Sequence, residues 1–112
     1  MRKVIHSKEF DDFFDTLPKQ VREKILFAQN IIIEMKVVSS KLVKKLIGTD
    51  FYELRIPMQD EWRIIISAMD NDSFIECSSV LMLNGFKKKS TKDYRKQINK
   101  AQRIIKEYKN EI

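Results

Sequence analysis

The chain has 112 residues, a formal net charge of +6 and a pI of about 9.5. A chain of this length can bury enough surface for one core, so we expect a single domain covering residues 1–112. Hydrophobic residues make up 43% of the chain and charged residues 34%, which argues against disorder. The positive charge favours a polyanionic partner: nucleic acid, an anionic membrane surface or an acidic protein.

The longest apolar runs argue against a membrane-spanning helix. Ile31–Ile33, Ile64–Ile66 and Val80–Leu83 are far shorter than the roughly 20 residues that such a helix needs. The N-terminus has no apolar stretch followed by a cleavage site, so we expect a cytoplasmic protein. One cysteine, Cys77, and one histidine, His6, offer neither an internal disulfide nor the usual Cys/His metal cluster, and we expect no metal and no cofactor.

The N-terminal third predicts a helical hairpin after a short edge strand at Val4 and Ile5. Ser7 can cap a first helix, and Pro18 suits the first turn of a second. Apolar residues recur at helical spacing in both segments. They are Phe10, Phe13, Phe14 and Leu17 in the first helix, and Val21, Ile25, Ala28, Ile32 and Met35 in the second.

From residue 51 the apolar period changes to two, which indicates antiparallel strands of a sheet with one face on the core. In the first of these strands Tyr52, Leu54, Ile56 and Met58 share one face, and Phe51, Glu53 and Arg55 share the other. In the next strand Trp62, Ile64, Ile66 and Ala68 share one face, and Arg63, Ile65, Ser67 and Met69 share the other. After a turn at residues 70–72, residues 73–86 predict a third strand, long enough that we expect a bulge or bend.

A last helix is expected to open at Asp93, and Gly85 is expected to let the chain turn from the third strand toward it. The predicted fold is therefore α+β: an N-terminal helical hairpin packed on a small antiparallel β-sheet and closed by a C-terminal helix. The apolar positions of the last helix are Ile98, Ala101, Ile105 and Tyr108.

Residues 87–109 concentrate positive charge. They hold ten cations against two anions, Asp93 and Glu107, so this segment alone carries +8 while the whole chain carries +6. Such asymmetry suits binding to a phosphate backbone, and the alternative is a solvated helix face. The cations are Lys87, Lys88, Lys89, Lys92, Arg95, Lys96, Lys100, Arg103, Lys106 and Lys109.

Arg55 and Arg63 lie among hydrophobic strand residues, where a guanidinium needs a partner or water. Each alone can form a structural ion pair with Glu53 or Glu61. The two arginines share a sheet face opposite each other only if the connecting loop has an odd number of residues, for example residues 58–60. A tight two-residue turn would put them on opposite faces.

Taken together, these motifs resemble the RelE/ParE toxin superfamily, and most closely its HigB-like branch. The resemblance rests on VKKLIGTDFYELRI, EWRIII, LMLNGFKKKS and INKAQRIIKEY in this order, and it covers residues 43–108. It implies the toxin of a type II toxin–antitoxin pair, an endoribonuclease that cuts mRNA on the 70S ribosome without a metal. The implied partner is a cognate antitoxin, commonly with a helix-turn-helix DNA-binding domain, and operator DNA would be bound only through that antitoxin.

The resemblance also implies site residues. The implied catalytic residues are Arg55 of the ELR motif, Arg63 of the tryptophan–arginine motif, and Lys87 and Lys88 of the lysine motif after glycine–phenylalanine. Such cations can stabilise the phosphorane that forms when an RNA 2′-hydroxyl attacks the adjacent phosphate. A lysine crowded by other cations loses its proton more readily, so Lys87 or Lys88 is a candidate base. The implied substrate-binding residues are Lys44 and Lys45, in the loop before the first long strand, and Asn84, Lys89 and Tyr94.

Two positions depart from the family pattern. Asn84 stands where relatives often have a histidine and cannot transfer a proton, so the acid and the base are unassigned. Tyr94 stands near the place of a proline, and it can pack, stack on a base or donate a proton. Two competing functions remain open: a ParE-like toxin that inhibits DNA gyrase, and a non-catalytic basic module that binds RNA or an acidic partner. Convergence of the four catalytic cations on one cleft would favour the ribonuclease.

Overall fold

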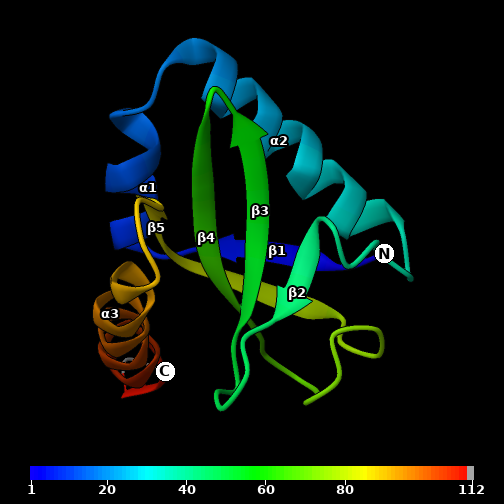
Figure 1. Ribbon diagram of the computed structural model, residues 1–112. Helices are drawn as coiled ribbons and strands as arrows, with labels where there is room; N and C mark the ends of the chain where they lie inside the picture. Colours follow the sequence, from blue (N-terminus) through cyan, green and yellow to red (C-terminus); the bar gives the residue numbers. More distant parts are fainter. Residues whose placement is uncertain (111–112) are drawn as a thin grey trace.

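A computed structural model describes residues 1–110 as a five-stranded sheet with three helices packed around it (Figure 1). The strand order is β1-β5-β4-β3-β2, with β1 parallel to β5 and every other neighbouring pair antiparallel. The predicted α+β class is confirmed. In chain order the elements are β1 (Lys3–His6), α1 (Lys8–Asp15), α2 (Lys19–Glu34), β2 (Val43–Lys45), β3 (Tyr52–Met58), β4 (Asp60–Ala68), β5 (Ser79–Lys87) and α3 (Lys92–Asn110).

The N-terminal helices form as their caps predict. The Ser7 hydroxyl accepts a hydrogen bond from the Phe10 backbone N–H at 2.9 Å, and α2 begins directly after Pro18. Glu34 is the last residue of α2, so the expectation that Met35 continues the buried stripe is wrong, and its side chain is exposed. Across residues 1–110, no helix combines the length and the apolar character needed to cross a membrane.

The two sheet faces carry two separate cores, so the expectation of a sheet with one face on the core is wrong. Side chains of one face pack with α1 and α2, and side chains of the other face pack with α3. The first core includes Phe10, Ile25, Ile32, Leu54, Ile56, Ile64, Ile66 and Met82. The second includes Phe51, Ile65, Leu81, Leu83, Phe86, Ala101 and Ile104.

The β3–β4 hairpin has the register that brings the two arginines together. Arg55 pairs directly with Arg63, and Met58 pairs with Asp60. Gln59 alone connects them, with a positive φ of 62°. The connecting loop therefore has an odd number of residues, so Arg55 and Arg63 share the face that packs toward α3.

Strand β5 is shorter than expected and contains the predicted bulge. It begins at Ser79, whereas residues 73–78 form turns that bury Phe74 in the first core. Within the strand, Ile65 of β4 pairs with Asn84 and the next residue, Ile66, pairs with Met82. One residue of β5, Leu83, is therefore left without a partner, which shifts the alternation of every side chain that follows it.

Gly85 does not form the expected turn toward the last helix. It lies inside β5, and a Cβ added there would approach the Phe13 ring to 2.3 Å. The glycine thus makes room for α1 to pack on the sheet. Lys44 and Lys45 also differ from expectation, because they lie in β2 and not in a loop.

Candidate active site

A buried carboxylate links the arginine pair. Glu53 of β3 has a side chain only 3% exposed, and its Oε1 accepts a hydrogen bond from Arg55 Nε at 2.8 Å. Its Oε2 lies 3.9 Å from Arg63 Nε. The Arg63 side chain is 6% exposed and the Arg55 side chain 33%, so Arg55 is the more accessible guanidinium. Both arginines therefore form an ion pair with the same carboxylate, that of Glu53.

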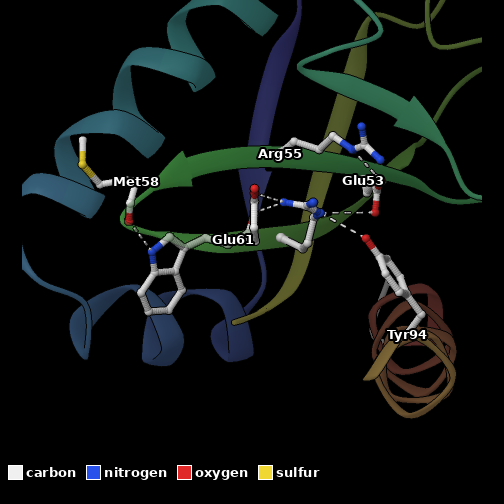
Figure 2. Close-up of polar contacts among 7 residues, drawn as sticks. Glu53, Arg55, Met58, Glu61 and Tyr94 are labelled. Carbon is white, nitrogen blue, oxygen red and sulfur yellow. Dashed lines mark hydrogen bonds and ion pairs between the residues drawn. The ribbon is translucent and has the colours of Figure 1, made fainter. Parts of the chain in front are cut away.

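Tyr94 joins this group from α3. Arg63 Nε donates a hydrogen bond to the Tyr94 hydroxyl oxygen at 3.0 Å, and Figure 2 shows the phenol reaching from the helix toward Glu53 on β3. On its other side Arg63 Nη1 donates to Glu61 Oε2 at 3.1 Å. The Tyr94 ring meets Phe86 edge-on with centroids 5.5 Å apart, so the residue packs as well as hydrogen-bonds.

These contacts shift two pKa values. Burial raises the pKa of the Tyr94 phenol, the Glu53 carboxylate adds to that rise, and the Arg63 guanidinium opposes it. Burial acts to lower the pKa of Arg63, but its hydrogen bonds to Tyr94 and Glu61 and the charge of Glu53 outweigh burial and raise it. Tyr94 is therefore a protonated phenol near neutral pH, held against a permanently charged guanidinium.

The structure brings only one of the two catalytic lysine candidates to this face. Lys88 lies beyond the end of β5 with its Nζ 5.6 Å from the Tyr94 ring centroid, and its backbone N–H donates to the Glu61 carbonyl. Lys87 pairs with Trp62, on the face that packs against α1 and α2. Its Nζ lies 5.5 Å from the Trp62 ring centroid and 3.6 Å from Asp60 Oδ2.

The expected substrate-binding residues are also divided. Lys44 pairs with Glu53, so it is exposed on the arginine face, whereas Lys45 pairs with Tyr52 on the other face. Lys89 is exposed in the connection before α3. Asn84 is only 1% exposed, and its Nδ2 donates to the backbone and side-chain oxygens of Gln97. In this position Asn84 ties β5 to α3 and does not face a substrate.

Glu53 is the residue that sequence reasoning undervalued. The alternation of β3 places it on the Arg55 face, but its central place depends on Arg63 and Tyr94, which are distant in sequence. The sequence does place a charged residue between two apolar strand residues and two positions before Arg55, which is a signal for a buried ion pair. Among residues 1–110, no three or more histidine, cysteine or acidic side chains cluster in a way that could hold a metal ion.

Comparisons with known proteins agree with this fold. The family model described as "Phage derived protein Gp49-like (DUF891)" matches residues 12–106, which is most of the chain. No curated protein matches the sequence.

Three solved structures from E. coli share the architecture at 16% sequence identity. The intact RelBE toxin–antitoxin complex gives a TM-score of 0.62, covering 80% of this chain and 100% of the matched one. A mutant of the RelE toxin in the free state gives a TM-score of 0.64, covering 88% of this chain and 95% of the matched one. The isolated RelE toxin gives a TM-score of 0.62, covering 88% of this chain and 97% of the matched one.

The predicted resemblance to the RelE/ParE superfamily is thus confirmed, while its HigB-like branch stays a prediction. At this level of identity the solved structures establish the fold, and the family model establishes the family. This chain belongs to the Gp49-like family of phage-derived proteins and has the fold of the RelE toxin.

Proposed function

We propose that this protein is the toxin of a type II toxin–antitoxin pair, a cytoplasmic endoribonuclease that cuts ribosome-bound mRNA without a metal. The observation that carries the proposal is the direct cross-strand pairing of Arg55 with Arg63, with Tyr94 on the same face. A module that only binds a polyanion needs no such pair next to a protonated phenol. The RelE-like fold and the +8 segment at residues 87–109 support the same function.

The proposed reaction breaks one phosphodiester bond. The 2′-hydroxyl oxygen attacks the adjacent phosphorus, its proton passes to a base, and the bond to the 5′-oxygen breaks as that oxygen takes up a proton. The negative charge that grows on the phosphorane needs fixed cations. Arg55 is a third exposed and reaches toward solvent, so it is the guanidinium that contacts the phosphate. Arg63 makes its hydrogen bonds through Nε and Nη1, and within residues 1–110 its Nη2 has none, so this group can also donate to a phosphate oxygen.

Tyr94 is the proposed proton donor for the leaving 5′-oxygen. Its raised pKa keeps the phenol protonated, which suits an acid and excludes a base near neutral pH. Arg63 holds the hydroxyl oxygen at 3.0 Å and stabilises the phenolate that would form on proton transfer. This role answers the question left by Asn84, which occupies the place of the family histidine but is buried.

Lys88 and Glu53 complete the proposed site. Lys88 lies beside the Tyr94 ring on the arginine face and is the lysine placed to contact the phosphate or serve as base. Glu53 accepts a hydrogen bond from Arg55 and lies 3.9 Å from Arg63 Nε, so it positions Arg55 and stabilises the charge of Arg63 without touching the substrate. Lys44 on the same face is proposed to bind the substrate backbone, while Lys87 and Lys45 on the opposite face contribute less.

The proposed partner is a cognate antitoxin. One of the similar structures is a toxin–antitoxin complex, which supports a protein partner for this chain too. We propose that the antitoxin carries a helix-turn-helix DNA-binding domain, as the HigB-like resemblance implies, and that operator DNA is bound only through it.

The test is induced expression of the wild type and of Arg55→Gln, with growth and mapped mRNA 5′ ends as readouts. Gln at this partly exposed position removes the charge and can still donate a hydrogen bond to the buried Glu53, and circular dichroism would check that the variant folds. Lys24→Gln is the matched control, because Lys24 is an exposed lysine of α2 on the far side of the sheet from α3. We expect growth arrest and new cuts inside reading frames for the wild type and the control, and loss of both for Arg55→Gln.

Other outcomes would point elsewhere. Growth arrest without cuts would contradict the ribonuclease and move the target to a protein such as DNA gyrase. Cuts that persist unchanged in folded Arg55→Gln would show that the arginine pair is structural. Absence of both arrest and cuts in the wild type would leave a non-catalytic basic module.

A further inference from the structure

A row of cations runs along the outer face of α3, away from the arginine pair. Successive cations of the row are four, four, three and three residues apart, so they stay on one side of the helix. At a rise of 1.5 Å per residue the row is about 21 Å long. The opposite side of α3 buries Ala101 and Ile104 against the sheet. We call this set the α3 cation row; it consists of Lys92, Lys96, Lys100, Arg103 and Lys106.

The cations of the α3 cation row form no ion pair in the described part of the chain. Asp93, at the start of the helix, accepts hydrogen bonds from the Lys89 and Ser90 backbone N–H groups instead. Like charges three and four residues apart destabilise a helix, and an ordinary solvated helix interleaves acids with its lysines. In α3 the row has two acids nearby, Asp93 three residues before Lys96 and Glu107 four residues after Arg103, against five cations. Such an excess of positive charge is the arrangement expected where an external polyanion supplies the negative charge.

The surface beside the row has the chemistry of a phosphate and sugar contact. Asn99 and Gln102 line a shallow hollow together with Lys96, Arg103 and Lys106. Amide side chains next to cations are the groups that proteins use to contact phosphate and ribose oxygens. The apolar side of α3 is already buried, so this is not an amphipathic helix free to enter a membrane surface.

The absence of an aromatic side chain from the row decides between single-stranded and double-stranded RNA. Proteins that bind single strands combine cations with aromatic rings on which bases stack. The two tyrosines of α3, Tyr94 and Tyr108, pack on the opposite side with the second core. Duplex RNA is recognised by its shape and its phosphates, which a straight row of point charges fits.

We propose that the α3 cation row binds the phosphate backbone of double-stranded RNA, as a second RNA-binding surface separate from the arginine pair. This inference rests on the proposed function, since an enzyme acting on ribosome-bound mRNA works among RNA duplexes. The row anchors the protein to a duplex while the arginine face contacts the single strand that is cut.

The test measures binding of a 2′-O-methylated RNA duplex to the full-length protein by fluorescence anisotropy across a salt titration. The methylated duplex lacks 2′-hydroxyls, so binding is read without cleavage. If all five cations contact phosphates, affinity should fall about 500-fold between about 50 and 200 mM salt, at a slope of about 0.9 per contact. In the triple variant Lys96→Gln, Lys100→Gln, Arg103→Gln the loss over the same range should be about tenfold.

A matched triple variant controls for net charge. Lys3→Gln, Lys24→Gln, Lys41→Gln removes the same charge from exposed positions outside α3 and should keep the wild-type salt slope. Equal slopes in the two triple variants would overturn the proposal. So would tighter binding of the methylated single strand than of the duplex, or tighter binding of poly-glutamate, which would assign the row to an acidic protein.

The proposed RNA cleavage and the proposed duplex binding can be refuted independently of each other. Loss of cleavage in Arg55→Gln with unchanged duplex binding is the result expected if both hold. Failure of the wild type to bind the duplex, with mRNA cuts intact, would overturn the α3 surface and leave the ribonuclease standing.

Discussion

Replacing Glu53 by glutamine tests whether the buried carboxylate holds the site together. Glutamine has nearly the same shape, and its oxygen can still accept the hydrogen bond from Arg55 Nε. The negative charge that faces Arg63 is lost, however. Arg63 then remains 6% exposed with the neutral Tyr94 hydroxyl and Glu61, whose side chain is 56% exposed, as its other partners.

The expected cost follows from this burial. Removing one partner of a buried ion pair costs about 3–5 kcal/mol, because the other charge stays buried without compensation. Glu61 partly compensates Arg63, so we expect a loss at the lower end, about 3 kcal/mol in the free energy of unfolding. For a chain of this size that corresponds to a fall in Tm of about 10–15 °C.

Urea titration followed by circular dichroism, with Trp62 fluorescence as a second probe, measures this difference. The paired variant Glu53→Met, Arg63→Met replaces both charges by apolar side chains and should be more stable than Glu53→Gln, since no charge is left buried alone. A Glu53→Gln protein within about 0.5 kcal/mol of the wild type, well below the cost of a broken buried pair, would refute the reasoning. So would a paired variant less stable than the single one.

Three further predictions concern the two faces of the sheet. The difference between the ultraviolet titrations of the wild type and of Tyr94→Phe should show a phenol that ionises above pH 10, because its pKa is raised. The contribution of this phenol to the free energy of unfolding is then kept below that pH and falls above it. Ionisation below pH 10 would contradict this prediction. Lys88→Gln should lower RNA cleavage by about 100-fold and Lys87→Gln far less, so equal losses would count against the face assignment. Gly85→Ala should cost about 1–3 kcal/mol in urea titrations, but little in a Phe13→Ala background; equal costs in both would exclude a clash with that ring.

The alternation of residues predicts the face of each side chain in β3 and β4 because both strands are regular. It leaves the register open, since one loop residue more or less moves Arg63 to the other face relative to Arg55. The structure resolves this with Gln59 at a φ of 62°, a conformation that glycine or asparagine usually signals. A glutamine gives no such signal, so the arginine pair could be predicted only as one of two alternatives.

The contacts around Glu53 were beyond sequence reasoning for a different reason. Its place beside the two guanidiniums depends on the β3–β4 register, and its contact with Tyr94 exists only because α3 packs on this face. Residue spacing within one strand identifies a shared face, but it does not show which distant element covers that face. The ion pair with Arg55 was therefore predictable, and the four-residue group with Arg63 and Tyr94 was not.

The bulge at Leu83 decides which lysine joins the arginines. With strict alternation from Leu81, residues 83, 85 and 87 would all point toward α3, and Lys87 would lie beside Arg63. The unpaired residue shifts that pattern by one, so that Phe86 and then Lys88 take the α3 side. The length of the segment predicts that a bulge exists, but not where, because the residues around Leu83 are apolar and suit either core. A role inferred from a run of consecutive lysines can therefore be given to one of them only after the bulge has been placed.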